Sequence, residues 1–259
     1  MSECVGIILA AGVSSRMKTT VPKVLHEVCG RPMLAYVLDA CRGAGIEKLY
    51  VVVGFGADQV KKRLGSDNDI VWVQQEEQNG TAHAVLCCKD QLKDFEGEVL
   101  ILCGDGPLIR TETLKTLIEK HHSKGSAATL ATAVVDDPSG YGRIIRGEDG
   151  SIKCIVEHND CDEEQLKIKE INPSYYIFEK KVLFGALEEV RPDNAKKEYY
   201  LTDAVAIIIE SGRKLSAVRA VRPEEAISVN TKEQLSRMNE IMLERVEGSK
   251  SNEAGATAG

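Results

Sequence analysis

Along the first hundred residues, short apolar runs alternate with segments whose apolar residues recur at helical spacing. Each run is continuous and bounded by polar or turn-forming residues, which is typical of a strand buried on both faces. The runs cover residues 5–11, 48–53, 70–75 and 99–103. Helical spacing follows the first run at Leu34, Val37, Leu38 and Cys41, and a charged segment occupies residues 59–64. This alternation predicts an α/β fold with a Rossmann-like, mostly parallel sheet flanked by helices.

The pattern becomes β-rich between residue 126 and about residue 178. Strands are predicted there, separated by the turn signals DDPSG and GEDG, at residues 129–135, 143–146 and 152–156. We expect this part to form a subdomain that closes one wall of a cleft. Further elements are predicted as a helix at residues 201–210, strands at 215–221 and 226–229, and a helix from 231 to about 246. Residues 248–259 lack an apolar anchor, and we expect them to form a disordered tail.

The loop after the first predicted strand combines small residues with cations. Gly12 and two serines leave the backbone N–H groups accessible, and Arg16, Lys18 and Lys23 follow within a few positions. Pro22 restrains the backbone just before Lys23. Because ligands bind where parallel strands end, this loop predicts a polyphosphate site. The alternative is an ordinary strand-to-helix turn with solvated cations, since neither a Walker loop nor a dinucleotide fingerprint is present.

Composition narrows the classes of function. The formal net charge of −7 argues against a nucleic-acid-binding protein, which needs a basic face. The eight cysteines form no C-x-x-C pair and lie mostly in apolar runs, which favours reduced thiols in a cytoplasmic protein over disulfides or a zinc site. The N-terminal apolar run is too short to span a membrane, and Glu3 stands where an export signal would carry positive charge. We therefore expect neither nucleic acid nor a membrane as a partner.

The segment LAAGVSSRMKTTVPKVLHEVCGRPML (9–34) resembles the signature of the sugar nucleotidyltransferases. It is most similar to the uridylyltransferase domains of bacterial N-acetylglucosamine-1-phosphate uridyltransferases. The resemblance continues in order through QQEEQNGTAHAV (74–85), GDGPLI (104–109), DDPSGYGRIIR (136–146), IVEHND (155–160), EIN (170–172), EYYLTDAV (198–205) and SVNTKEQL (228–235). It implies a nucleotide-diphospho-sugar transferase fold, UTP and a sugar 1-phosphate as substrates, and Mg²⁺ as the cofactor.

The resemblance also implies a domain organisation. It predicts one nucleotidyltransferase domain at 1–247, divided into a nucleotide-binding half (1–125), a β-rich half that binds the sugar and completes the metal site (126–230), and a C-terminal helix (231–247). The six-residue repeats of the acetyltransferase half of those enzymes are not seen, so we expect uridylyl transfer alone. We expect a monomer or weak homodimer that makes nucleotide sugars for the cell envelope.

For the metal, the resemblance assigns Asp105 and Asn230 as ligands. Magnesium prefers hard oxygen ligands and usually takes only one or two from the protein. From the local sequence alone, Asp105 could equally cap a turn, and Asn230 could cap the last helix. The resemblance further assigns Arg16 and Lys23 to the phosphates, so that Arg16, Lys23 and Asp105 form the predicted catalytic set.

The nucleotide is expected to contact residues from three of the resembling segments and Cys103, which precedes the third. These residues are Leu9, Ala10, Ala11, Gly12, Lys23, Gln75, Gly80, Thr81, Cys103 and Gly104. A glutamine amide can pair with the uracil edge through both its donor and its acceptor. The alternative for Gln75 and Thr81 is a solvated strand end followed by an N-cap. We expect His83, one turn into an apolar helix, to be a packed structural histidine.

The sugar is assigned by resemblance to Gly142, Glu157 and Asn172, together with Asn230. This chain departs from the family pattern here, because Asn172 is followed by Pro173 and Ser174 where threonine and glycine are usual. Proline removes a backbone donor and serine adds bulk. Cys103 also stands where the family often has tyrosine. N-acetylglucosamine 1-phosphate is the preferred acceptor, with glucose 1-phosphate or another hexose 1-phosphate as the alternative.

The predicted reaction is attack by a phosphate oxygen of the sugar 1-phosphate on the α-phosphorus of UTP, in line, with expulsion of pyrophosphate. It needs no protein nucleophile, only alignment and charge stabilisation. Two alternatives stay open. Nucleotidyltransferases of molybdenum-cofactor assembly share a similar LAAGxSSRM loop, and a silent regulatory paralogue could keep the fold. The retention of Arg16, Lys23, Asp105 and Asn230 together argues against a silent protein.

Overall fold

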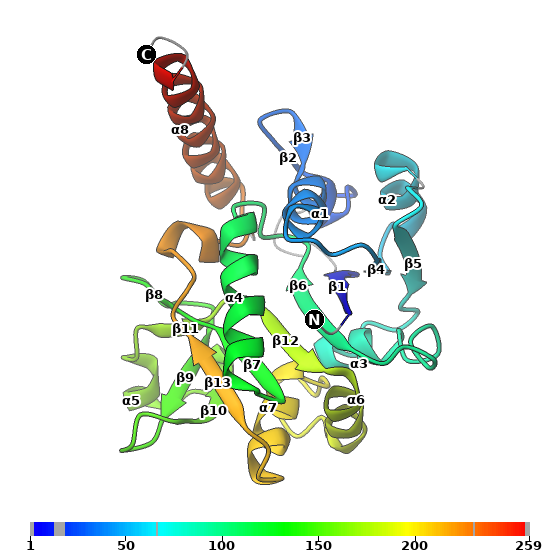
Figure 1. The fold of residues 1–259 in the computed structure, drawn as a ribbon, viewed down its shortest axis with the longest axis vertical. Coiled ribbons are helices and arrows are strands. Elements are labelled where there is room, and N and C mark those ends of the chain that lie inside the picture. Colours follow the sequence, from blue (N-terminus) through cyan, green and yellow to red (C-terminus); the bar gives the residue numbers. More distant parts are fainter. Residues whose placement is uncertain (1–2, 13–18, 66, 230, 257–259) are drawn as a thin grey trace.

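A seven-stranded sheet forms the centre of the computed structural model, which describes residues 3–12, 19–65, 67–229 and 231–256 (Figure 1). Its strands are β1 (Cys4–Ala10), β4 (Leu49–Val53), β5 (Ile70–Gln74), β6 (Glu98–Cys103), β7 (Ala128–Ala131), β12 (Tyr176–Glu179) and β13 (Leu215–Val218). They lie in the order β13-β7-β12-β6-β1-β4-β5. All neighbours are parallel except β12, which runs antiparallel to β6 and β7. The predicted α/β fold with a mostly parallel sheet is confirmed.

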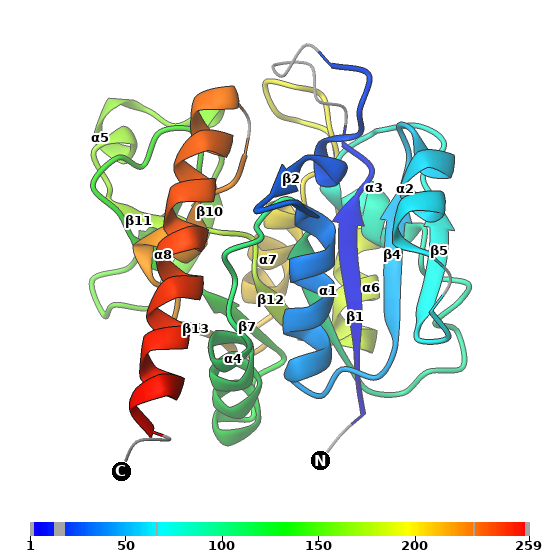
Figure 2. The ribbon, with the colours of Figure 1, turned by 90° about the horizontal axis from the view of Figure 1, so that it is seen from above.

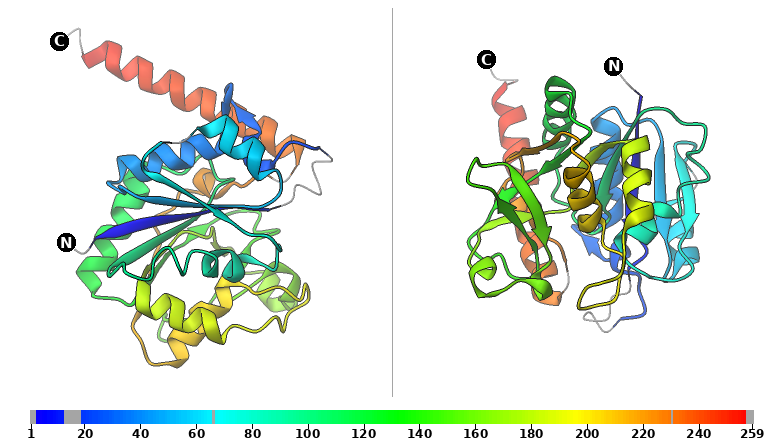
Figure 3. Two further views of the ribbon diagram at one scale, coloured as in Figure 1. Left: turned by 90° about the vertical axis from the view of Figure 1, so that its right-hand side faces the viewer. Right: turned by 90° about the horizontal axis from the view of Figure 1, so that it is seen from below.

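Helices cover both faces of this sheet (Figure 3). One face packs against α3 (Thr81–Leu86), α6 (Lys180–Glu189) and α7 (Leu201–Glu210), and the other against α1 (Met33–Gly43), α2 (Ala57–Leu64) and α4 (Thr111–Lys124). Successive residues of β1 point to opposite faces, so Ile7 belongs to the first core and Ile8 to the second. Both are fully buried. Burial on both faces explains why the strands appear in the sequence as continuous apolar runs.

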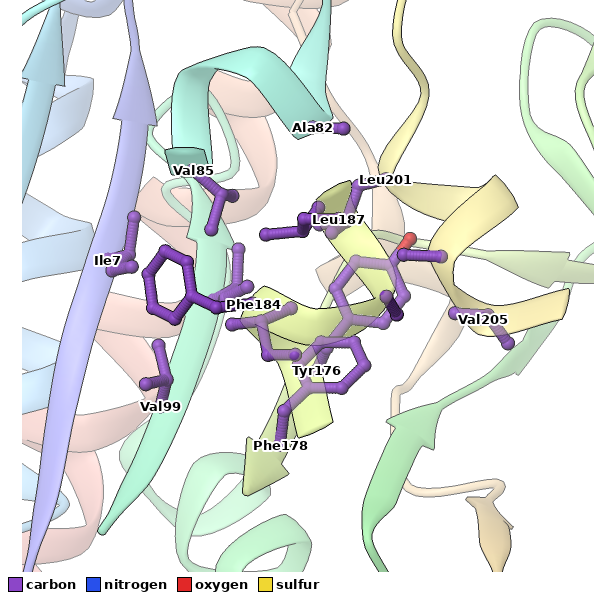
Figure 4. Packing of buried hydrophobic residues seen from close by; sticks show 14 of the residues in the cluster. Ile7, Ala82, Val85, Val99, Tyr176, Phe178, Phe184, Leu187, Leu201 and Val205 are labelled. Carbon is purple, nitrogen blue, oxygen red and sulfur yellow. The ribbon is translucent and has the colours of Figure 1, made fainter. Parts of the chain in front are cut away.

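The core beneath α6 joins distant parts of the chain (Figure 4). Phe184 of α6 lies among Ile7, Val85 and Val99, which come from β1, α3 and β6. Each of these residues is 6% exposed or less. This packing ties β1 and β6 to α3, whose first residue, Thr81, lines one of the cavities described below.

A second, four-stranded sheet has the order β10-β9-β11-β8. Its strands are β8 (Ala133–Val134), β9 (Gly142–Arg146), β10 (Ile152–Val156) and β11 (Glu170–Asn172). The expected single strand at 129–135 is therefore wrong, because the chain leaves β7 and enters the other sheet at Thr132, whose hydroxyl donates to Glu170 at 2.7 Å. Within the β-rich part between residues 126 and 178, β8 to β11 form this second sheet, whereas β7 and β12 belong to the large sheet.

Short elements complete this part of the fold. They are the hairpin β2 (Glu27–Val28) and β3 (Arg31–Pro32), the helix α5 (Glu163–Leu166), and the 3-10 helices η1 (Lys23–Leu25), η2 (His158–Asp160) and η3 (Pro223–Ala226). The expected strand at 226–229 is wrong. Pro223 begins η3, and the buried carboxylate of Glu225 accepts from the Thr113 hydroxyl at 2.7 Å, which ties η3 to α4 instead of to a sheet edge.

The last helix, α8 (Lys232–Ala256), packs through Met238 and Met242 on Val28, Met33 and Leu108. Its C-terminal part extends away from the rest of the molecule (Figure 1). The expected disorder from residue 248 is therefore wrong up to Ala256. The helix continues past its packed half although residues 248–256 include two glycines, two serines and an asparagine, which are poor helix formers. Within the described ranges, no helix combines the length and apolarity needed to cross a membrane.

Candidate functional site

Two cavities open beyond the carboxyl ends of β1, β5 and β6. The larger cavity, about 510 Å³, is lined by Leu9, Ala10, Ala11, Gly12, Gln75, Gly80 and Thr81 among others. The smaller cavity, about 190 Å³, is lined by Gly142, Glu157, Asn172 and Ser174 among others. Lys23, Cys103 and Asp105 line both. The structure thus brings the predicted nucleotide residues and the predicted sugar residues to adjoining cavities with a shared boundary.

The boundary is marked by an ion pair between Lys23 and Asp105. Lys23 begins η1, directly after Pro22, whose φ of −51° sets the direction of the chain. Asp105 follows β6 through Gly104. Each side chain is 17% exposed, and both charged groups line the two cavities. An ammonium group and a carboxylate group therefore lie side by side at the boundary of the two cavities.

Asp105 is suited to a magnesium ion. Its carboxylate supplies hard oxygen atoms at the edge of both cavities. In the ranges that the structure describes, no group of three or more His, Cys, Asp or Glu side chains is placed to hold a metal. A single protein carboxylate suits a cation that keeps water and phosphate ligands, as magnesium does. The other predicted ligand, Asn230, and the predicted phosphate cation Arg16 lie outside the described residues.

Gln75 is 3% exposed at the end of β5, and its amide group is used partly within the protein. The amide nitrogen donates to the Gly80 carbonyl at 3.2 Å and lies 3.1 Å from Nδ1 of His83. In the Nε2-protonated tautomer of His83, both amide hydrogens are therefore engaged. With that tautomer the amide oxygen is the group left for a base, whereas the sequence predicts that Gln75 offers both a donor and an acceptor. His83 is hydrogen-bonded, in line with a structural role.

The turn at Gly80 is built against a second loop, from residue 190 to 200. Gly80 has a φ of +110°, and a Cβ there would lie 2.4 Å from the Tyr199 carbonyl oxygen. The Ala82 N–H donates to that oxygen at 2.9 Å. The Thr81 hydroxyl accepts from the Leu201 N–H at 2.9 Å, so Thr81 caps α7 and not its own helix. These bonds hold the 190–200 loop beside the larger cavity.

In the smaller cavity, Glu157 follows β10 and accepts a hydrogen bond from the Thr202 hydroxyl at 3.1 Å. Burial raises the pKa of the Glu157 carboxyl, an effect that the bond from Thr202 partly opposes. Gly142, on the neighbouring strand, leaves room for this arrangement, since a Cβ there would lie 3.0 Å from Ile155 and 3.6 Å from Glu157. A buried acceptor of this kind can bind hydroxyl or amide groups of a ligand.

Asn172, 3% exposed, is also held within the protein. Its amide nitrogen donates to the Tyr176 hydroxyl at 2.5 Å, and its oxygen accepts from the Ser174 N–H at 3.2 Å. Ser174 adopts a φ of +66°, which is strained for any residue except glycine. Burial raises the pKa of the neighbouring Cys103 thiol to about 12, so this group is neutral at physiological pH. The wall of the smaller cavity is thus uncharged here.

Sequence reasoning missed several residues of the two cavities. Tyr141, Tyr175 and Ser228 line the smaller cavity, and Lys196 and Glu198 line the larger one. Most of them lie in or beside the resembling segments GYGRI, EYYLTDAV and SVNTKEQL, so their neighbourhood was the available signal. Among the predicted nucleotide-binding residues that the structure describes, Gly104 is the one that lines neither cavity. Gly104 is buried, and a Cβ atom at this position would lie 3.1 Å from the Leu34 side chain.

A Rossmann-like sheet with two adjoining cavities at its carboxyl edge can bind a nucleotide beside a second ligand. The model of the MobA-like NTP transferase domain matches residues 6–203, and the chain belongs to this family.

Curated relatives are similar over nearly the whole chain. The bifunctional protein GlmU of Clostridium botulinum (strain 657 / Type Ba4) is 48% identical over 246 residues, which are 95% of this chain and 53% of that protein. GlmU of Geobacillus thermodenitrificans is 46% identical over 240 residues, 93% of this chain and 52% of that protein. The chain thus spans about half the length of these relatives. A solved UDP-glucose pyrophosphorylase complexed with UDP-glucose shares the fold, with a TM-score of 0.78 at 19% identity over 95% of this chain and 100% of that chain.

Proposed function

We propose that this protein transfers the uridylyl group of UTP to N-acetylglucosamine 1-phosphate, giving UDP-N-acetylglucosamine and pyrophosphate. The observation that carries the proposal is the shared boundary of Lys23, Cys103 and Asp105 between the two cavities. A nucleotide in the larger cavity and a sugar phosphate in the smaller one would bring their phosphates together at this boundary. The similarity to the GlmU proteins favours UTP and N-acetylglucosamine 1-phosphate among the possible pairs.

The residues would act by position and charge. The Lys23 ammonium would bind phosphate oxygens of UTP, and Arg16 would add a second cation. Asp105, with Asn230, would hold Mg²⁺, which when bound neutralises phosphate charge and orients the leaving pyrophosphate. The acceptor phosphate is already ionised at neutral pH, so the chain needs no nucleophile and no general base. Its task is to hold the acceptor oxygen opposite the leaving group.

Substrate choice would be divided between the cavities. Gln75, Gly80 and Thr81 would contact the base and ribose, and Glu157 with Asn172 the sugar hydroxyl and acetamido groups. The protein would work in the cytoplasm as a monomer or weak homodimer.

A matrix of the five common nucleoside triphosphates against several hexose 1-phosphates, scored by pyrophosphate release with magnesium present, tests this proposal. UTP with N-acetylglucosamine 1-phosphate should give the highest kcat/KM. A preference for GTP or CTP would contradict the base assignment, and a preference for glucose 1-phosphate would contradict the acceptor assignment.

A further inference from the structure

The loop between α6 and α7 lies at the carboxyl edge of the sheet, where Figure 2 shows it in yellow beyond the end of β1. Asn194 orders this loop. Its side-chain oxygen accepts from the N–H groups of Lys196 and Glu198, both at 3.2 Å, and its amide nitrogen donates to the Glu198 carbonyl at 2.6 Å. The Ala195 N–H donates to Asp160 at 2.9 Å. Lys196 is thus an exposed cation on a backbone fixed by side chains.

Lys196 lies on the wall of the larger cavity, and its charge also reaches the smaller one. Lys23 and Lys196 are the cations that line the larger cavity in the described part of the chain. The positive charge of Lys196 opposes the burial effect on Glu157, which lines the smaller cavity. The bond from Ala195 to Asp160, three residues after Glu157, places the loop that carries Lys196 beside the smaller cavity as well.

The charges along the loop indicate which phosphate Lys196 would meet. Glu198 stands between Lys196 and Tyr199, whose backbone contacts the turn at Gly80. A carboxylate at that position repels phosphate from the base-binding end of the wall. The charge of Lys23 is balanced by Asp105. A dianionic acceptor entering from the smaller cavity would find Lys196 as an additional cation.

Resting on the proposed function, we infer that Lys196 binds the phosphate of the sugar 1-phosphate and helps to hold it at the boundary of the two cavities. It is a substrate-positioning contact that acts through the phosphate and not through the sugar ring. A single charge-assisted hydrogen bond of this kind changes affinity by roughly 10- to 100-fold.

The test compares Lys196→Ala with Lys197→Ala in the otherwise intact protein. Lys197 is the adjacent exposed lysine, lines neither cavity and has a φ of +57° that alanine would share. Lys196→Ala should raise KM for N-acetylglucosamine 1-phosphate by roughly 10- to 100-fold, leaving KM for UTP unchanged. Lys197→Ala should change neither constant, and Lys196→Arg should restore most of the lost affinity.

Inhibition by free N-acetylglucosamine, which lacks the phosphate, should be equal in the wild type and in Lys196→Ala. Equal KM values for the sugar 1-phosphate in Lys196→Ala and Lys197→Ala would overturn the inference, and so would a rise in KM for UTP alone. In either case the wild-type activity would leave the proposed function standing. A wild-type protein that neither binds a sugar 1-phosphate in calorimetry nor releases pyrophosphate would overturn the proposed function and this inference together.

Discussion

Lys23 and Asp105 satisfy each other's charge at the boundary of the two cavities, and each side chain retains some exposure to solvent. In a pair as buried as this one, the cost of removing both charges from water offsets much of their attraction, so the pair adds little to stability. The pair is therefore poorly explained as a device for stability. The proposed function gives the pair another purpose, in which the ammonium would bind phosphate and the carboxylate would hold a metal.

Replacing Asp105 tests this explanation. Asp105→Ala should lower kcat for pyrophosphate release by roughly 100-fold or more, as expected for the loss of one transition-state stabiliser. The melting temperature should stay close to that of the wild type. Asp136→Ala, at a fully exposed aspartate on the surface, is the control and should keep full activity. Full activity in Asp105→Ala, or undiminished wild-type activity in excess chelator, would rule out the metal assignment.

Gln75 carries the prediction about the base. Gln75→Ala should reduce the preference for UTP over CTP by about 1–3 kcal/mol, the cost of leaving a buried polar partner unmatched. The measurement is the ratio of kcat/KM for the two nucleotides, with Glu76→Ala at the exposed neighbouring position as the control. An unchanged ratio in Gln75→Ala would move base recognition to the backbone near Gly80.

At this scale the sequence predicted most of the cavity lining but not how each side chain is used. Gln75 was placed correctly at the larger cavity, yet its internal bonds depend on the Gly80 carbonyl and on His83, which only the folded turn brings close. Lys196 could not be found from the sequence, because its position depends on the bonds of Asn194 within its own loop.

At the scale of elements, the larger cavity depends on the contact between the turn before α3 and the loop before α7. Residues about 120 positions apart are joined there, since the Leu201 N–H donates to the Thr81 hydroxyl. The backbones approach so closely that no side chain fits at Gly80. The two cavities are thereby linked, because the same loop carries Lys196 at the larger cavity and leads to Thr202, which donates to Glu157 at the smaller one.

Gly80→Ala should break this contact. We expect the free energy of unfolding to fall by more than about 2 kcal/mol, since the new methyl group combines a positive φ with a clash against the Tyr199 backbone. KM for UTP should rise as well. Gly212→Ala is the matched control, because Gly212 has a φ of +73° but open space around it, and it should cost only about 1 kcal/mol. Equal urea-denaturation midpoints for the two variants would show that the contact is not a tight one.

Element boundaries were predictable wherever burial alone decided them. The expected helix at 201–210 has the observed bounds, and β4, β5, β6 and β10 lie within a residue of their predicted runs. The failures have tertiary causes. The predicted strand is interrupted at Thr132 because the residues before it pair in one sheet and the residues after it pair in the other. Residues 226–229 form no strand because Glu225, just before them, is buried against α4. The C-terminal helix extends beyond the predicted end, and neither an apolar anchor nor the helix propensity of residues 248–256 accounts for this extension.

For the whole molecule, stability should depend on pH through Asp203, in the first turn of α7. Burial, and next the nearby Asp160, raise the pKa of the Asp203 carboxyl from 3.8 to about 6. Between these values the folded protein retains a proton that the unfolded chain releases, so stability falls as pH rises through this window. Above about pH 6 the full cost of the buried charge is present.

Asp203→Asn removes this cost. The melting temperature of Asp203→Asn minus that of the wild type should be larger at pH 7.5 than at pH 4.5. The other titrating groups are the same in both proteins, so their effects cancel in this difference. Scanning calorimetry of both proteins at the two pH values measures this difference. A difference that is the same at both values, or larger at pH 4.5, would show that Asp203 titrates normally.

The central claim is that the two adjoining cavities join UTP to a sugar 1-phosphate. The most direct measurement incubates the purified protein with Mg²⁺, UTP and N-acetylglucosamine 1-phosphate, and quantifies pyrophosphate and UDP-N-acetylglucosamine in the same samples over time. We predict that both products appear in equal amounts, and that neither forms when UTP or the sugar 1-phosphate is left out. Pyrophosphate released from UTP without the sugar phosphate, or no UDP-sugar from the complete mixture, would contradict the account.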